Sequence, residues 1–144
     1  MSGETNLNKL LATMAPQLLE DEYVFVTVEN GRYGEHATLS PIASFMEAEG
    51  LTLVLTKSNA DKEGLSYEGS FRCITLLVHS SLEAVGLTAA VATKLAAHQI
   101  SANVIAGYYH DHIFIQATNA DRAMSALHTL SQENQRYLLR FGYN

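Results

Sequence analysis

Two serines and a glycine surround a turn that could bind a small anion. Ser80 and Ser81 follow a predicted strand, and Gly86 precedes an alanine-rich predicted helix. The first amide groups of a helix lack partners within the helix and, together with the helix dipole, attract carboxylates. A serine pair before a helix is also a common cap, and Glu83 in the same turn would repel a carboxylate. The pattern therefore leaves two interpretations open, a ligand site or a plain cap.

Two histidines in a predicted hairpin turn have a spacing that could suit a metal ion. In the segment Tyr108–His112, His110 and His112 flank Asp111, and on an extended chain both rings point to one side. His79 could add a third ligand if its strand lies next to this hairpin. No acidic or cysteine ligand completes such a set, so we expect no metal and no cofactor. The alternative is a polar turn with local hydrogen bonds, whose tyrosines cover an interface.

The same residue types could form a hydrolytic triad from Ser80 or Ser81, His110 or His112, and Asp111. However, the sequence has no G-x-S-x-G elbow, and Asp111 lies between the two histidines on a chain too extended to orient either as a base. The phosphate-binding patterns G-x-G-x-x-G and G-x-x-x-x-G-K are also missing. We therefore expect a protein that is not an enzyme.

Composition narrows the classes of partner. The 144 residues are 47% hydrophobic, and nine Lys and Arg against fifteen Asp and Glu give a net charge of -6. The basic residues are scattered, which argues against nucleic acid. The first residues lack the pattern of a secretion signal, and no apolar run approaches the roughly 20 residues that cross a bilayer. We expect a cytoplasmic protein with no membrane partner, in which the lone Cys73 is a buried strand residue.

The first half of the chain is predicted to be mainly strands. Apolar residues at helical spacing predict a short helix over residues 6–14, and alternation predicts a strand over 22–28. Two glycines mark residues 29–40 as a loop. Strands are then expected over 41–46 and 51–56, followed by a short helix that starts at Ser58, with Ser58 and Asp61 as its capping pair.

The second half begins after the linker 66–70. We predict a strand over 71–79, a helix over 87–99 with Leu87, Val91 and Leu95 on its buried face, and strands over 101–106 and 112–117. A helix follows over 119–131, capped by Asn119, with a core face of Ala123, Met124, Leu127 and Leu130. Residues 136–141 are expected to be a last strand or a docked tail.

A shift of 60 residues lays LVLTKSNADK, residues 53–62, over IFIQATNADR, residues 113–122. The match falls at the same predicted strand-to-helix turn in both halves, as a duplicated module would leave it. We therefore divide the chain into a degenerate first half, 1–70, and a second half, 71–144. The fold class is α+β and ferredoxin-like, βαββαβ in tandem, with antiparallel sheets and helices on one face. The helix at 6–14 is a candidate cover for the vacant sheet face of the first half.

The stretch HSSLEAVGLTAAVATKLAAHQISANVIAGYYHDHIFI, residues 79–115, resembles bacterial proteins of unknown function in the ACT-domain superfamily. YVFVTV with the following GRYG, and FMEAEGLTLVL, are similar to the first half of that tandem family, which is also similar to the ACT pairs of cytosolic arginine sensors. The resemblance implies a regulatory module that binds an amino acid or another small metabolite at a module or subunit interface. Most regulatory ACT domains are fused to an enzyme, and this chain is too short to include one.

In such relatives the turn after the first strand and an acidic residue near the second and third strands hold the ligand, which implies Asp111 beside the amine of the ligand. Asn103 is a further polar candidate, although such a strand residue most often pairs with backbone. We expect a homodimer, and the alternative is a homo-oligomeric interaction protein with no metabolite ligand. The predicted ligand-binding residues are Ser80, Ser81, Leu82, Val85, Gly86, Leu87, Asn103, Tyr109, Asp111 and His112.

Overall fold

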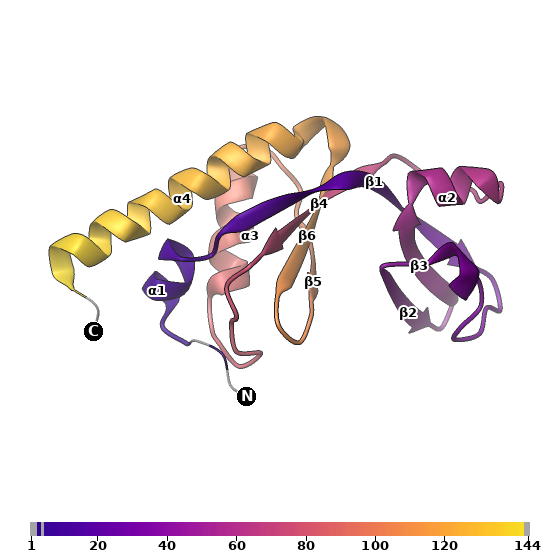
Figure 1. Ribbon diagram of the computed structural model, residues 1–144, viewed down its shortest axis with the longest axis horizontal. Coiled ribbons are helices and arrows are strands. Elements are labelled where there is room, and N and C mark those ends of the chain that lie inside the picture. The colour runs from indigo at the N-terminus through magenta and orange to yellow at the C-terminus, as the bar shows by residue number, and fades with distance from the viewer. Residues whose placement is uncertain (1–2, 4, 143–144) are drawn as a thin grey trace. The chain divides into compact units, whose positions relative to one another are not determined.

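The computed structural model describes residue 3 and residues 5–142 of the chain. Figure 1 shows its helices and strands. The helices are α1 (Leu7–Ala12), α2 (Lys57–Lys62), α3 (Leu87–Ala97) and α4 (Ala120–Phe141), with short 3-10 turns η1 (Ala37–Leu39) and η2 (Ala117–Asn119). The strands are β1 (Pro16–Val28), β2 (Ala43–Glu47), β3 (Gly50–Thr56), β4 (Phe71–Leu76), β5 (Asn103–Ala106) and β6 (Asp111–Gln116).

The chain forms two compact units, which we call the middle unit and the terminal unit. The middle unit runs from Glu20 to Arg72, and the terminal unit joins the segment that ends at Leu19 to the segment that starts at Cys73. Both β1 and β4 cross a boundary between units and contribute residues to each. A single cut in the sequence therefore does not separate the packed units, because residues before Glu20 fold with the second half of the chain.

Both units have the strand order of a ferredoxin-like sheet. In the order β2-β3-β1-β4-β6-β5, the middle unit uses β2-β3-β1-β4 and the terminal unit uses β1-β4-β6-β5. Counted from β1, the strands of the middle unit have the order 2-3-1-4. Counted from β4, with β1 as the fourth strand, those of the terminal unit have the order 4-1-3-2, which is the same order read from the other edge. The matching sequences 53–62 and 113–122 lie where β3 meets α2 and where β6 meets α4. The predicted tandem ferredoxin-like fold is confirmed.

The core of the middle unit lies between α2 and one face of its sheet. Val24 of β1 pairs with Leu55 of β3, and Val26 pairs with Leu53, so alternate residues of both strands share this face. Ala60 of α2 packs against them and is fully buried. Each buried leucine or valine stabilises this core by roughly 1.5 to 3 kcal/mol. The loop that connects β1 to β2 contains only η1, as the glycines predict.

The core of the terminal unit is larger and confirms the predicted helix faces. Ile74 and Leu76 of β4 and Ile113 and Ile115 of β6 form the sheet side of one cluster. Apolar residues of α1, α3 and α4 cover these four side chains. The helix residues are Leu10, Leu11, Leu87, Val91, Leu95, Ala123 and Leu127. The four-residue spacing in α3 places Leu87, Val91 and Leu95 on one buried stripe, as expected for an amphipathic helix.

The first helix covers the terminal unit and not the middle unit, so its expected role as cover for the first half is wrong. The carbonyl oxygen of Ala12 accepts hydrogen bonds from Ser131 Oγ at 3.0 Å and from Gln135 Nε2 at 2.9 Å. Asn8 Nδ2 donates to the side-chain oxygen of Asn134 at 3.1 Å. The apolar face of α1 is buried with α3 and α4 because these helices supply the larger apolar surface.

Residues 136–141 are not a strand, because α4 continues through them to Phe141. Of the two expected forms, the docked tail is the one that fits, since Leu138 is buried, and it is helical. The residue types of 136–141 favour helix, and the helix ends only at Gly142, which has φ of 87° and donates its amide to the Leu138 carbonyl. The place of the expected last strand is taken by the start of β1. Just before it, Ala15 and Met14 accept hydrogen bonds from the amides of Leu77 and Val78, each at 3.3 Å.

Two local predictions need smaller corrections. The cap of α2 is Thr56, whose hydroxyl accepts from the Asn59 amide at 3.2 Å, so the predicted pair of Ser58 and Asp61 is wrong. Ser58 lies inside the helix because the helix begins at Lys57. Strand β4 ends at Leu76 and not at residue 79, because the chain bends there toward the turn that precedes α3.

Candidate functional site

The turn between β4 and α3 is organised by its own serines. The Ser81 hydroxyl accepts from the Glu83 amide at 3.1 Å, and the Ala84 amide donates to the Ser81 carbonyl at 3.0 Å. These bonds leave Leu82 and Val85 on the surface, where they are exposed. Ser81 therefore stabilises the turn itself, while the apolar side chains of the turn point to solvent.

Gly86 sets the start of α3. Its φ of 102° lies in the left-handed region, and a side chain there would meet the Leu7 side chain at 3.0 Å. Ala90 donates the first helical amide bond to the Gly86 carbonyl at 2.8 Å. Because glycine has no side chain, it cannot cap the first amide groups of α3. The start of the helix therefore keeps its electrostatic attraction for a negative group.

Gly3 lies directly against this turn. A Cβ built on Gly3 would lie 2.6 Å from the His79 carbonyl oxygen and from the Ser81 nitrogen, so only glycine fits in this position. The close approach places backbone on one side of the turn that holds Ser80 and Ser81. A ligand on that side of the turn would therefore contact Gly3.

The hairpin between β5 and β6 brings Asp111 to the same place. The hairpin turn closes with the Gly107 amide bound to the His110 carbonyl at 2.9 Å, and Asp111 then pairs with Ala106. Ser80 Oγ donates to Asp111 Oδ2 at 3.4 Å. The structure thus joins the serine turn and the acidic residue, which lie 31 residues apart in the sequence.

Asp111 also borders a narrow cavity beneath the start of α3. The cavity is too narrow to admit a water molecule. Its walls are Leu76, Leu87, Thr88, Val91, Val104, Asp111 and Ile113. The carboxylate therefore faces the first turn of α3 from the helix side of the sheet. A ligand would have to bind at the outer rim of the turn or open the contact between Ser80 and Asp111.

His112 and Asn103 lie on the other face of the sheet, because side chains alternate along a strand. His112 Nδ1 contacts Thr75 Oγ1 at 3.0 Å, and Asn103 Nδ2 donates to the Phe114 carbonyl at 3.2 Å. Burial lowers the pKa of His112 below its ordinary value of 6.5, His110 adds to this effect, and Asp111 opposes it. The predicted site residues therefore divide between two faces of the sheet.

Tyr109 lies at the exposed tip of the hairpin in a small group of rings. Its ring centroid is 5.2 Å from that of His79 and 4.9 Å from that of Tyr108. Aromatic rings at these separations attract one another by about 0.5 to 1.5 kcal/mol. The group joins His79, which lies beyond the end of β4, to the hairpin turn.

The histidines of this region contact backbone, a hydroxyl or a ring rather than a common metal position. His110 Nδ1 lies 3.4 Å from the Val78 carbonyl oxygen, the His79 ring is tilted by 54° against that of Tyr109, and His112 contacts Thr75. Among residue 3 and residues 5–142, no group of three or more His, Cys, Asp and Glu residues could hold a metal ion. Ser80 contacts Asp111 directly, so these contacts do not form the serine-to-histidine step of a triad.

The sequence did not indicate two open grooves. In the terminal unit, a groove of about 480 Å³ is lined by three polar residues of α4, His128, Ser131 and Gln135, and by Ala12, Thr13, Ala15, Pro16, Gln17 and Leu77. In the middle unit, a groove of about 470 Å³ lies beside the start of α2 and is lined by Asp21, Glu22, Thr56, Lys57, Ser58, Asp61 and Lys62. The spacing of Lys57 and Asp61, four residues apart, indicated their ion pair but not the groove.

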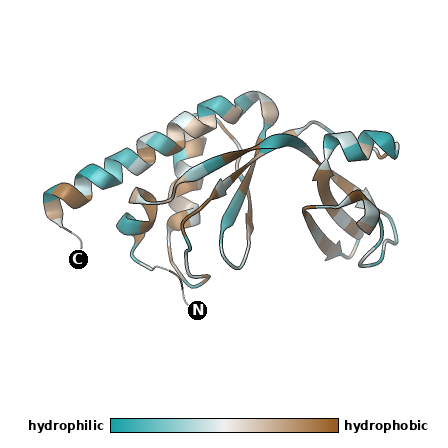
Figure 2. Ribbon diagram, viewed as in Figure 1, coloured by the Kyte–Doolittle hydropathy of each residue, from teal (hydrophilic) through white to brown (hydrophobic). Residues whose placement is uncertain are grey.

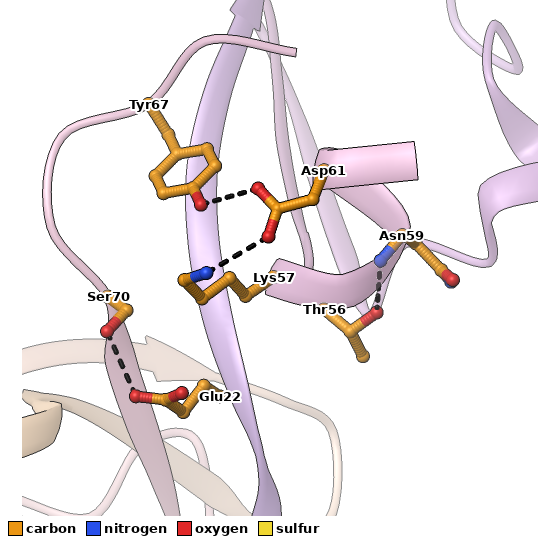
Figure 3. A network of polar contacts seen from close by, with 7 residues as sticks. All are labelled: Glu22, Thr56, Lys57, Asn59, Asp61, Tyr67 and Ser70. Carbon is orange, nitrogen blue, oxygen red and sulfur yellow. Dashed lines mark hydrogen bonds and ion pairs between the residues drawn. The ribbon is translucent and has the colours of Figure 1, made fainter. Parts of the chain in front are cut away.

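Figure 3 shows how the charged groups of the middle unit neutralise one another. Lys57 Nζ lies 3.0 Å from Asp61 Oδ2, and the Tyr67 hydroxyl donates to Asp61 Oδ1 at 2.6 Å. The Tyr67 hydrogen bond and then Lys57 lower the pKa of Asp61, while the hydrogen bond to Asp61 raises the pKa of Lys57. Ser70 donates to Glu22 at 3.1 Å nearby. This arrangement is a solvated ion pair rather than an open binding site.

Sequence models of the ACT domain match both halves of the chain, one over residues 2–72 and another over residues 68–129. A comparison with curated proteins finds no match. None of the helices in the described part of the chain is long and apolar enough to cross a membrane.

Solved structures give the same fold. A protein of unknown function from Vibrio cholerae, described as a possible transport protein, is 55% identical over 87% of this chain and 95% of its own, with a TM-score of 0.80. A protein from Agrobacterium tumefaciens is 12% identical over 81% of this chain and 87% of its own, with a TM-score of 0.68. The regulatory subunit of aspartate kinase from Thermus thermophilus is 11% identical over 83% of this chain and 97% of its own, with a TM-score of 0.61.

Proposed function

Because the chain belongs to the ACT-domain family, we propose that it is a non-enzymatic regulatory protein that binds a small molecule, an amino acid, at the turn before α3. The family is the general support for this role, since ACT domains are typically regulatory modules for small molecules. The regulatory subunit of aspartate kinase from Thermus thermophilus shares the fold at low identity.

The observation that carries the proposal is the contact of Ser80 with Asp111 at the start of α3. An amino acid needs a positive partner for its carboxylate and a negative partner for its amine. The amide groups at the start of α3 supply the first, and the Asp111 carboxylate supplies the second. Ligand binding replaces the hydrogen bond from Ser80, because that bond is long and an ammonium group pairs better with a carboxylate.

A thermal-shift screen with the twenty amino acids tests this proposal. A ligand present at 100 times its dissociation constant adds about 2.7 kcal/mol to the free energy of unfolding. We expect at least one amino acid to raise the melting temperature of the wild-type protein. Asp111→Asn keeps the shape of the side chain but removes its charge, so the shift should disappear in this variant.

Glu49→Gln is the matched control, because it also replaces a carboxylate by an amide on an exposed residue, in the turn between β2 and β3. This variant should keep the full ligand-induced shift. A shift that survives in Asp111→Asn, or that disappears equally in both variants, contradicts the assignment of the amine partner. The absence of a shift with every amino acid contradicts the proposed ligand class.

The exposed apolar residues at the same turns favour a second candidate, an interaction protein without a metabolite ligand. Leu82, Val85, Tyr108 and Tyr109 are all exposed there, and clustered exposed apolar side chains commonly mark a protein interface. Under this alternative, a wild-type protein that does not respond to amino acids would lose self-association when Val85 is replaced by lysine.

A further inference from the structure

Three consecutive residues, where the hairpin enters β6, contact β4 or the segment that follows it. His110 Nδ1 lies 3.4 Å from the Val78 carbonyl oxygen, and Asp111 Oδ2 accepts from Ser80 Oγ, also at 3.4 Å. The third residue, His112, contacts β4 itself. Asp111, the proposed partner of the ligand amine, therefore lies between two imidazole rings along the chain, in a hairpin that is held at three points.

The ring of His112 lies between β4 and the backbone of the hairpin. Its Nδ1 is 3.0 Å from Thr75 Oγ1. At the other nitrogen of the ring, a Cβ built on Gly107 would lie only 3.3 Å from His112 Nε2, so the ring rests against the hairpin backbone. Figure 2 shows the hydrophilic start of β6 and the apolar stretch that follows it. The ring is thus held at the hairpin end of the strand, next in sequence to Asp111.

Asp111 supplies the negative charge that acts on this ring. Burial lowers the pKa of His112 below its ordinary value of 6.5, His110 adds to this effect, and the Asp111 carboxylate acts in the opposite direction. On β4, Thr75 does not titrate in this range, and burial raises the pKa of the Cys73 thiol, whose Sγ lies 3.9 Å from Thr75 Oγ1, so the thiol stays neutral. The residue of β5 that pairs with His112 is an isoleucine. The proton on the ring and the charge of Asp111 therefore influence each other.

We propose that a proton on His112 and an amino acid at Asp111 oppose each other, so that the protein releases the amino acid as the pH falls. This inference rests on the proposed function. The ammonium group of the amino acid neutralises the Asp111 carboxylate and removes the charge that favours a protonated ring. In return, a protonated ring weakens the attraction of that carboxylate for the ammonium group. The two effects are equal in free energy, because the coupling between two binding sites is reciprocal.

The direction of the pH dependence follows from this coupling. Because a bound ammonium group cancels the effect of Asp111, the pKa of His112 is lower in the complex than in the free protein. At neutral pH the ring carries no proton in either form, and the affinity is full. As the pH falls below 6.5, the free protein takes up the proton before the complex does, so the affinity declines. It levels off once the ring is protonated in both forms.

Isothermal titration calorimetry at about pH 7.5 and at about pH 5 tests the coupling. Each amino acid except histidine, whose own ring titrates in this window, is titrated into the wild-type protein and into His112→Asn. In the wild type, the dissociation constant should be roughly two- to tenfold larger at the lower pH, as expected for two charges near a solvated surface. In His112→Asn, the two constants should be nearly equal.

Two further histidine variants are matched controls. His110→Asn removes the other ring that flanks Asp111, and it should keep the wild-type ratio of dissociation constants because the proposal assigns the proton to His112. His128→Gln removes an exposed histidine on α4 and controls for the replacement of a histidine as such.

A second readout needs no amino acid. Nuclear magnetic resonance signals of the histidine rings give the pKa of His112 in the wild type and in Asp111→Asn. Removing the carboxylate removes the interaction that raises this pKa, so His112 should titrate at a lower pH in Asp111→Asn. Glu49→Gln replaces an exposed carboxylate in the turn between β2 and β3 and should leave the titration unchanged. A purely structural role of Asp111 would leave it unchanged in both variants.

The possible failures separate this inference from the proposed function. Equal dissociation constants at both pH values in the wild type, or a wild-type ratio that persists in His112→Asn, overturn the coupling while the proposed function stands. The same holds if His112 titrates identically in the wild type and in Asp111→Asn, or if His110→Asn alone abolishes the pH dependence. The absence of binding by every amino acid at either pH overturns the proposed function and this inference with it.

Discussion

The position of His112 on the helix-free face of its sheet makes the stability of the protein depend on pH. Burial lowers the pKa of His112 below its ordinary value of 6.5, so the folded state prefers the neutral ring. As the pH falls below 6.5, the unfolded chain takes up this proton before the folded protein does. Stability due to this residue should therefore decline through that window and level off below the folded pKa.

Urea unfolding between about pH 7.5 and 5 tests this dependence. His112→Asn keeps a nitrogen near Thr75 but cannot titrate, so the stability of this variant should change less with pH than that of the wild type. His128→Gln, which removes an exposed histidine on α4, controls for the replacement of a histidine as such. An equal slope in the wild type and in His112→Asn would show that this ring is not desolvated.

Alternation along a strand explains which site residues the sequence could predict. The hairpin turn and the buried residues Ile113 and Ile115 were predictable, and counting back from them places Asp111 on the helix side. The same count places His112 on the opposite side, so its inclusion with Asp111 in one site does not follow from alternation. The bond between Ser80 and Asp111 joins residues 31 positions apart and required the packing of β4 beside β6.

At the scale of elements, the start of α2 provides a direct comparison of two hydroxyl residues. Thr56 caps the helix through the Asn59 amide, whereas Ser58 is exposed inside the helix. Thr56→Ala should lower the free energy of unfolding by about 1 kcal/mol, because the cap bond is lost. Ser58→Ala should leave it within about 0.5 kcal/mol of the wild type. Chemical denaturation of both variants measures the difference, and a larger loss in Ser58→Ala would favour the cap expected from sequence.

The last turns of α4 provide a second comparison, between neighbouring leucines. Leu138 is 3% exposed and Leu139 is 81% exposed. Leu138→Ala should cost about 2 to 5 kcal/mol, because it removes buried methyl groups and leaves a cavity. Leu139→Ala should change the free energy of unfolding by no more than about 0.5 kcal/mol. Equal effects in denaturant titrations would mean that residues 136–141 do not dock as a helix.

The sequence predicted most elements because their apolar spacing is regular. Leu87, Val91 and Leu95 indicate α3 unambiguously, while the short apolar run at 136–141 fits either a strand or a helix. Ser131 and Leu138 are seven residues apart on the buried face of α4, and Gly142 supplies the stop, so the longer helix had a signal in the sequence. The length of β1 had a weaker signal in the sequence, because residues 16–21 are mostly polar or only partly buried.

At the scale of the whole molecule, the sequence repeat and the compact units divide the chain at different residues. We propose that 1–70 and 71–144 are the duplicated sequence units, in line with two ACT-domain matches that meet near residue 70. The packed units instead exchange strands, since β1 and β4 each serve both. Sequence periodicity could not predict this sharing, because it depends on which strand fills the fourth position of each sheet.

The central claim is that an amino acid binds at the turn between β4 and α3, and a nuclear magnetic resonance titration tests it most directly. Amino acids are added in turn to ¹⁵N-labelled wild-type protein, and the backbone amide signals are followed. Binding at this turn should give saturable shifts concentrated in residues 80–87 and at Asp111, with little change around Ser131 or Lys57. Saturable shifts centred on either of those two grooves, or no saturable shift with any amino acid, would contradict it.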